Sequence, residues 1–190
     1  MRIKDEAKQS AIIDATVKLV NEIGFVSSSV SKIAKEANVS PATLYIYYKN
    51  KEDLLVSTYL EIKQRLSEEI LSEFNQNAPI RDSLYKFWTN AFHFISQNNS
   101  YFQYTEQFAN SPYSEKVNHE DVEKSFTPIY EVLQKGIEQK IIKNVSFEIL
   151  SVFMFYPIMN LSNARLCKNI TADSKTIEDA FQLAWDAIKL

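Results

Sequence analysis

The sequence predicts an all-α fold, and three observations lead to that class. Only two of its 190 residues are glycine, whereas an average chain of this length contains about 13. Apolar residues recur at helical spacing almost throughout, and the connections between the helical stretches are short and polar. No stretch alternates convincingly between apolar and polar residues, and no Asn-Gly or Asp-Gly pair offers a hairpin turn. We therefore expect about nine helices and no sheet.

The first helix is predicted from about Asp5 to Glu22. Gly24 follows it as a C′ residue, a position that often requires a positive φ. Three consecutive serines, residues 27–29, then offer N-caps for a short helix predicted over residues 29–37.

The next turn carries its own signals. Asn38 suits a left-handed conformation, because asparagine is the best residue after glycine for that region. Ser40 is an N-cap residue and Pro41 occupies the first helical position, where a missing N–H costs nothing. A helix over residues 41–48 is therefore predicted after a turn at 38–40. Replacement of Asn38 by glycine should be tolerated, whereas a β-branched residue there should destabilise the turn.

The rest of the chain continues in helices. Asn50 is expected to cap a helix whose apolar stripe is Leu55, Tyr59, Ile62, Leu66, Ile70 and Phe74. Further helices are predicted over residues 81–97, 101–109, 114–139, 147–167 and 175–189. Pro157 should kink the helix in which it lies.

Composition excludes several functions. The two isolated glycines leave no dinucleotide fingerprint, phosphate loop or nucleophile elbow. Cys167 is the one cysteine and is expected to be a small buried apolar side chain. Two distant histidines offer no metal site. We expect no cofactor and no catalysis. The longest apolar run has eight residues, too few for a membrane span of about 20, and the N-terminus lacks the apolar core of a signal peptide, so a cytoplasmic location is expected.

Charge is distributed unevenly along the chain. Residues 1–51 carry a net charge of +3, and residues 52–190 carry −6. This asymmetry suggests an anionic partner for the N-terminal part, although a chance difference of a few charges explains it about as well.

Two short helices joined by a three-residue turn, over residues 29–48, form the pattern of a helix-turn-helix motif. Hydroxyl and cationic groups that suit phosphate oxygens lie along the second helix and its ends: Ser40, Thr43, Tyr45, Tyr47 and Lys51. Small residues at its start allow entry into a major groove. Taken alone, the pattern is also compatible with a helical corner inside an all-α core.

Residues 26–55 resemble the DNA-binding signature of TetR/AcrR-type transcriptional regulators. The matching positions are Ile33-Ala34, Val39-Ser40, Leu44-Tyr45 and Lys51-Glu52-Asp53-Leu54, and the resemblance extends over residues 6–66. Two positions differ from the family pattern, because Asn38 and Ala42 stand where glycine is common. The second difference should alter base contacts and leave the fold intact.

The resemblance implies a division of roles in DNA binding. The backbone would be positioned by Ser29, Ser31, Thr43, Tyr47 and Lys51. The base edges or the groove wall would face Pro41, Ala42, Thr43 and Tyr45. Residues 1–51 would then form the DNA-binding domain, and residues 52–190 an effector-binding and dimerisation domain.

Aromatic residues are concentrated in the second domain, which holds 20 of the 24. The helix over 81–97 is apolar on more than one side, so it is either central in its domain or lines a cavity. The resemblance implies a cavity for a small hydrophobic or aromatic effector. The candidate lining residues are Trp88, Phe92, Phe102, Tyr104, Phe108, Phe126, Tyr130 and Met154, with Glu106 for a cationic group. The alternative to an effector contact is that Glu106 is an ordinary exposed charge on its helix.

The last two helices, 147–167 and 175–189, are apolar nearly all round. The resemblance implies that they form a homodimer interface, and packing within one monomer is the alternative. The leading hypothesis is a dimeric repressor that binds a pseudo-palindromic operator in double-stranded DNA and is released by its effector. The alternative is a helical small-molecule-binding or scaffold protein without sequence-specific DNA binding.

Overall fold

The computed structural model describes residues 5–162 and 173–190. In these residues the regular structure is helical, apart from one isolated β-bridge between Ile142 and Lys189. The predicted all-α class is confirmed. Backbone contacts divide the chain into two compact units. The N-terminal unit comprises residues 1–63 and 100–118, and the C-terminal unit comprises 64–99 and 119–190. The segment 100–118 thus packs with the N-terminal helices, while the functional boundary at residue 51 remains a prediction.

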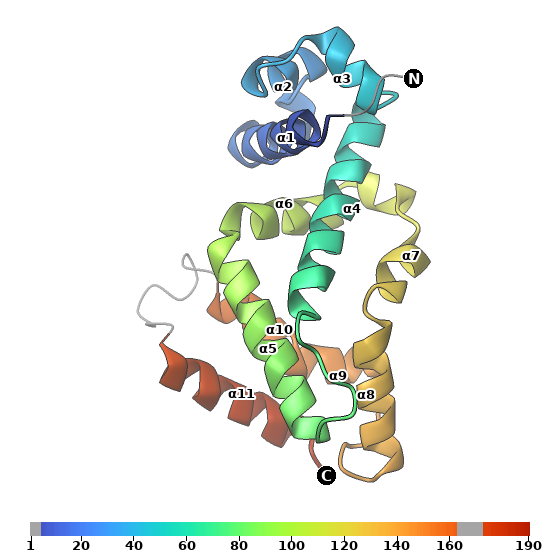
Figure 1. The fold of residues 1–190 in the computed structure, drawn as a ribbon, viewed down its shortest axis with the longest axis vertical. Helices are drawn as coiled ribbons and strands as arrows, with labels where there is room; N and C mark the ends of the chain where they lie inside the picture. The colour runs from blue at the N-terminus through green and yellow to red at the C-terminus, as the bar shows by residue number, and fades with distance from the viewer. Residues whose placement is uncertain (1–4, 163–172) are drawn as a thin grey trace. The chain divides into compact units, whose positions relative to one another are not determined.

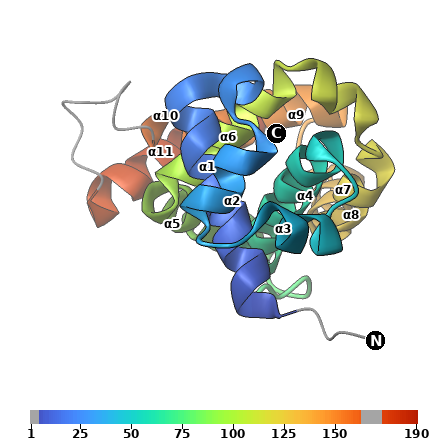
Figure 2. The ribbon, with the colours of Figure 1, turned by 90° about the horizontal axis from the view of Figure 1, so that it is seen from above.

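The N-terminal unit is built on three helices that pack in sequence order. Helix α1 contacts α2, and α2 contacts α3, as Figures 1 and 2 both show. The elements of this unit are α1 (Glu6–Ser27), α2 (Val30–Glu36), α3 (Pro41–Tyr47), the first part of α4 (Lys51–Ile70), α6 (Asn99–Ala109) and the 3₁₀ turn η1 (Pro112–Lys116).

Local chemistry sets the ends of α1. The Asp5 carboxylate accepts hydrogen bonds from the backbone N–H groups of Ala7 and Lys8, at 3.1 and 3.4 Å. Gly24 has φ +76° and ψ 167° and kinks the helix, which confirms the predicted positive φ. The chain then resumes a helical turn to Ser27, so the element extends beyond the predicted end at Glu22.

A compact apolar core holds these helices together. It contains fully or nearly fully buried residues of α1, α2, α3 and the start of α4: Ile12, Ala15, Ile33, Ala34, Ala37, Leu44, Tyr48 and Leu54. At α4, the Asn50 side-chain oxygen accepts from Asp53 N (2.8 Å), and the Asp53 carboxylate accepts from Lys49 N (2.7 Å). This reciprocal bonding confirms Asn50 as the cap.

Asn38 lies at the turn between α2 and α3 with φ +53°, which confirms the left-handed conformation predicted for it. We expect Asn38→Gly to change stability little and Asn38→Val to lower it by about 1–2 kcal/mol, because a Cβ-branched side chain is strained in this region. Thermal unfolding of the two variants measures the difference. Equal unfolding temperatures for both variants would contradict the account of this turn.

The C-terminal unit is arranged around α5 (Ile80–Gln97), which packs against α8, α10 and α11 (Figure 1). The Trp88 indole N–H on α5 donates to the carbonyl of Met154 at 2.8 Å. The other helices of this unit are α7 (His119–Lys124), α8 (Thr127–Glu138), α9 (Phe147–Met154), α10 (Tyr156–Leu161) and α11 (Ser174–Ile188). None of the described helices is long and apolar enough to cross a membrane.

The prediction of a single helix over residues 114–139 is wrong. That stretch contains part of η1, then α7 and α8. Val117 is extended (φ −84°, ψ 132°) and Phe126 leaves the helical region (φ −108°, ψ 8°). Pro128 lies in the first turn of α8, where it suits a helix start and opposes a continuous helix.

Two other helix boundaries differ from prediction. The stretch 147–167 is not one kinked helix, because α9 ends before Phe155 and α10 begins again with Pro157 in its first turn. Its last part, including Cys167, lies outside the described residues. Helix α4 ends at Ile70 rather than continuing to Phe74, since Glu73 turns to φ +57°.

Gly136 has a packing role that sequence patterns do not reveal. It is buried in α8, and a Cβ there would lie 2.5 Å from Cδ1 of Ile142 and 3.2 Å from Cγ2 of Ile80. Ile142 is itself fully buried. The glycine therefore allows the segment after α8 to fold back closely on that helix.

Candidate functional site

The helix-turn-helix of α2 and α3 is fixed by capping serines. Ser29 Oγ accepts from Lys32 N at 3.3 Å, and Ser40 Oγ accepts from Thr43 N at 3.0 Å. Ser40 Oγ also lies 2.9 Å from Thr43 Oγ1. A hydroxyl that accepts one hydrogen bond still has a proton to donate, so a cap at Ser29 is compatible with a phosphate contact.

The outward surface of this motif contains most of the residues predicted to touch DNA. Ser31, Pro41 and Ala42 are exposed, and Tyr45 keeps 54% of its surface accessible. Leu44, on the opposite side of α3, is fully buried. Helix α3 therefore has one side anchored in the core and another available to a partner.

Lys51 has an internal role that the sequence does not reveal. Its ammonium donates to the carbonyl oxygens of Phe25 and Val26, at 2.6 and 3.3 Å, near the end of α1. Burial lowers the pKa of Lys51. A cation at a helix C-terminus satisfies carbonyls that have no partner within the helix, so this lysine joins α4 to α1.

The Tyr47 side chain also makes hydrogen bonds within the N-terminal unit. Its hydroxyl accepts from Asp5 N at 3.0 Å and donates to Asp5 O at 3.3 Å. The side chain therefore fastens the start of α1 to the recognition helix. A phosphate contact by this hydroxyl would have to share or replace these bonds.

Lys51→Met is expected to lower the free energy of unfolding by about 1–3 kcal/mol, because it removes hydrogen bonds from a charged donor. The matched control is Lys49→Met, since the Lys49 side chain is exposed and its loss should change stability by less than about 0.5 kcal/mol. Urea denaturation measures both. Identical stabilities for the two variants would refute the structural role of Lys51.

The nine predicted effector residues belong to both units. Phe102, Tyr104, Glu106 and Phe108 lie in the N-terminal unit, whereas Trp88, Phe92, Phe126, Tyr130 and Met154 lie in the C-terminal unit. Most of the aromatic members are packed in the interior. Phe126 and Tyr130 are half-buried. Glu106 is exposed, which agrees with the alternative that it is an ordinary charge on the helix surface.

Tyr104 shows how tightly these aromatic residues are packed. It is fully buried, its hydroxyl donates to Leu55 O at 2.8 Å, and burial raises its pKa. Its ring stacks on Phe108 with centroids 6.1 Å apart, and Phe108 stacks on Tyr59 at 4.4 Å. In the described N-terminal unit these rings therefore form core, with the hydroxyl satisfied by the backbone.

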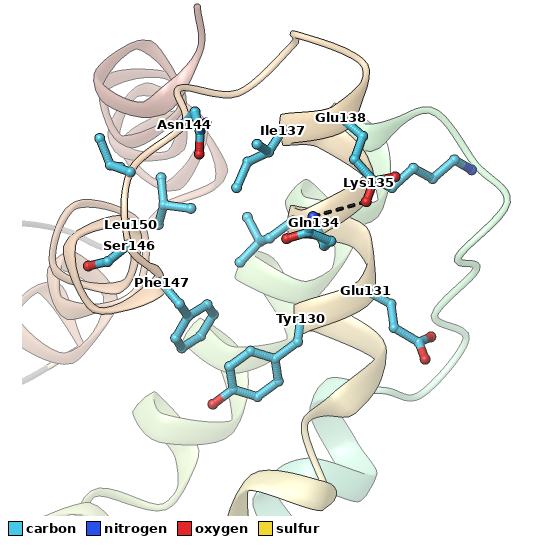
Figure 3. A pocket seen from close by; sticks show the side chains of 12 residues that line it. Tyr130, Glu131, Gln134, Lys135, Ile137, Glu138, Asn144, Ser146, Phe147 and Leu150 are labelled. Carbon is cyan, nitrogen blue, oxygen red and sulfur yellow. Dashed lines mark hydrogen bonds between the residues drawn. The ribbon is translucent and has the colours of Figure 1, made fainter.

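A hollow of about 590 Å³ lies in the C-terminal unit between α8 and residues 144–150 (Figure 3). Tyr130 from α8 and Phe147 from α9 point toward each other at one end, with ring centroids 4.0 Å apart. Leu133, Ile137 and Leu150 supply apolar lining. Tyr130 is the predicted effector residue that lines this hollow.

Comparison with known proteins identifies the family. Residues 12–58 match the description "Bacterial regulatory proteins, tetR family", and residues 79–189 match "Tetracyclin repressor-like, C-terminal domain". A crystal structure of a TetR family transcription regulator from Marinobacter aquaeolei VT8 is 34% identical over 100% of this chain and 99% of that one, with a TM-score of 0.91. The chain belongs to the TetR family.

Two further comparisons have names that mention fatty acids or a fatty acyl-CoA. The fatty acid metabolism regulator protein of Bacillus subtilis is 40% identical over 77 residues, which are 40% of each chain. The crystal structure of the Bacillus subtilis transcriptional regulator FadR in complex with stearoyl-CoA is 23% identical over 94% of this chain and 98% of that one, with a TM-score of 0.77. The second comparison shows a shared fold.

Membership in the TetR family makes this protein a ligand-responsive DNA-binding transcriptional regulator. The helix-turn-helix at residues 29–48 falls inside the matched N-terminal segment. That match favours a DNA-binding motif. The alternative compatible with the sequence pattern alone was a helical corner inside an all-α core.

The TetR-family recognition helix contains one exposed residue that was not predicted as a contact. Ile46 keeps 46% of its surface accessible and follows Tyr45 on α3. It lies four residues after Ala42, so both share a helix face. This spacing, together with an apolar side chain in a surface helix, is the signal by which sequence reasoning could have found it.

Proposed function

We propose that this protein is a transcriptional repressor that binds a pseudo-palindromic operator as a homodimer and leaves it when a small hydrophobic effector binds. The observation that carries the proposal is the exposed face of α3. Ala42, Tyr45 and Ile46 are exposed on a short helix whose opposite side, through Leu44, is anchored in the core. Apolar and hydroxyl groups on such a face suit thymine methyls and base edges in a major groove.

The proposed contacts divide into two groups. Base edges or the groove wall would meet Pro41, Ala42, Thr43 and Tyr45. The phosphates would meet Ser29, Ser31, Thr43, Tyr47 and Lys51, and the Ser40 hydroxyl is a further group that suits them. Because Tyr47 and Lys51 already bond to backbone groups, the serines are the more accessible phosphate donors.

The proposed dimer uses residues 147–167 and 175–189. Within their described part, α9 and the start of α10 present Ile149, Val152, Phe153 and Tyr156, which are 49–57% exposed. Their spacing places Ile149, Val152 and Phe153 on one face of α9, and Tyr156 follows at the start of α10. Helix α11 packs against α9 and adds Leu183, which is 73% exposed. An apolar face of this kind suits a second copy, and a two-fold dimer matches a palindromic site.

The proposed effector has an apolar body. The fatty acid metabolism regulator among the relatives supports an acyl chain, and the aromatic interior is compatible with it. We place the protein in the cytoplasm with its DNA, and we assign it no catalytic activity because relatives along nearly the whole chain are transcription regulators.

A gel-shift assay on the DNA that flanks its own gene tests the proposal. Tyr45→Ala should reduce operator affinity by about 10-fold to 100-fold while leaving binding to unrelated DNA unchanged, because it removes base contacts. Glu69→Gln at an exposed position of α4 is the control and should bind as the wild type does. Sequence-independent binding only, or none, would favour a small-molecule-binding or scaffold protein instead.

A further inference from the structure

A second hollow, of about 840 Å³, lies within the N-terminal unit and shares no lining residue with the hollow beside α8. It is lined by residues 23–26 at the end of α1, by residues 106, 107 and 110 at the end of α6, and by residues 111–113. Its wall is bare at Gly24, where a Cβ would meet no atom within 4 Å apart from its own helix and chain neighbours. The volume lies in the range of small-molecule sites.

The walls of this hollow are aromatic and anchored in the core. The rings of Phe25 and Tyr113 have centroids 5.5 Å apart, with 52° between their planes. Phe25 makes edge contacts with Tyr104 and Phe108, at 5.8 and 6.2 Å between centroids, and both of those rings are buried. Val26, which is 91% exposed, adds apolar surface at the rim. These walls suit a flat aromatic or apolar body.

Among the described residues that line the hollow, Glu106 alone carries a charge. Its carboxylate is exposed, as an ordinary surface charge is, and it makes no ion pair with the described part of the chain. What distinguishes Glu106 from other exposed acids is its position beside a hollow with aromatic walls. A ligand that fills this hollow would therefore meet one negative charge.

The end of α6 adds to the negative potential of the hollow. Carbonyls without helical partners give the C-terminal end of a helix a partial negative charge, which favours a cation. The last turn of α6 contains no basic residue. At the end of α1, in contrast, the ammonium of Lys51 occupies the carbonyls of Phe25 and Val26, and Lys51 does not line the hollow. The hollow thus suits a cation that the described chain does not itself supply.

We propose that this hollow binds a small aromatic amine in its protonated form. The Glu106 carboxylate accepts charge-assisted hydrogen bonds from the ammonium, and the rings of Phe25 and Tyr113 contact the aromatic body and attract the cation. The site goes beyond the proposed function, because it lies in the N-terminal unit and is separate from the place of the apolar effector. A ligand there borders the carbonyls through which Lys51 joins α4 to α1.

Three indoles with different side chains test the inference by calorimetry on the full chain at low ionic strength: cationic tryptamine, neutral tryptophol and anionic indole-3-acetate. The wild type should bind tryptamine about fivefold or more tightly than tryptophol, because only the ammonium pairs with the carboxylate. Indole-3-acetate should bind most weakly. Equal affinity for tryptophol, tighter binding of indole-3-acetate, or no binding of any of the three would overturn the inference.

Two substitutions of Glu106 connect the preference to this residue. Glu106→Gln should bind tryptamine and tryptophol equally, and Glu106→Lys should reverse the order and favour indole-3-acetate. Because Glu106 is exposed, both variants should unfold at the wild-type temperature, and thermal unfolding verifies this. A Glu106→Gln protein that still prefers tryptamine would overturn the inference.

Glu131→Gln is the matched control, because Glu131 is also an exposed glutamate and lines the hollow beside α8 (Figure 3). This variant should bind the three indoles as the wild type does. If Glu131→Gln rather than Glu106→Gln removed the preference for tryptamine, the amine would occupy the hollow beside α8 and the inference would be wrong. Tyr113→Leu should weaken tryptamine binding about threefold to tenfold, since it removes one aromatic wall, and unchanged affinity would contradict the proposed position of the ligand.

Discussion

Phe153→Asp is expected to convert the proposed dimer into monomers and to reduce operator affinity by about a hundredfold or more, because two linked half-sites bind far more tightly than one. Phe153 is 52% exposed on α9 and shares its helix face with Ile149 and Val152. A carboxylate at the centre of an apolar interface would be buried without a partner. The stability of the isolated chain should change little, since the side chain is already largely accessible.

Analytical ultracentrifugation measures the oligomeric state, and a gel shift measures the affinity. Val26→Asp is the control, because Val26 is 91% exposed in the N-terminal unit and lies outside the proposed interface. That variant should remain dimeric. A dimeric Phe153→Asp protein with undiminished operator binding would show that the interface lies elsewhere.

Leu44→Ala is expected to lower the free energy of unfolding by about 2–5 kcal/mol, as for other fully buried leucines. Leu44 has no accessible surface and packs in the core with Ile33 and Ala34. Because this core orients α3, the variant should also lose operator binding at temperatures at which the wild type binds.

Denaturant unfolding of Leu44→Ala, compared with Tyr45→Ala, makes the test specific. Tyr45 is the next residue on the same helix but is 54% exposed, so its loss should change stability by less than about 0.5 kcal/mol. One variant should therefore lose stability and the other only DNA affinity. The opposite pattern would mean that α3 presents its other side to the partner.

Features set by local chemistry were predictable from the sequence. Asn38, Ser40 and Asn50 act within three or four residues of themselves, so their turn and cap roles follow from residue type and spacing. The structure confirms the conformation of Asn38 and both caps. The same reasoning failed over residues 114–139, because apolar spacing continued across Pro128 and outweighed the helix start that this proline marks.

Roles that depend on long-range contacts were not predictable in this way. Lys51 lies where the family places a phosphate contact, yet its partners are carbonyls 25 and 26 residues away. The resemblance implied that Tyr104 and Trp88 line one effector cavity, but the two residues belong to different units.

The central claim is that α3 reads a specific palindromic site in DNA. Footprinting of the wild-type protein on the DNA flanking its own gene tests this claim most directly. We predict two protected half-sites, related by two-fold symmetry, with centres about 34 Å or a multiple of that apart, and loss of both on Tyr45→Ala substitution. Uniform protection without half-sites, or a footprint unchanged by the substitution, would contradict the account.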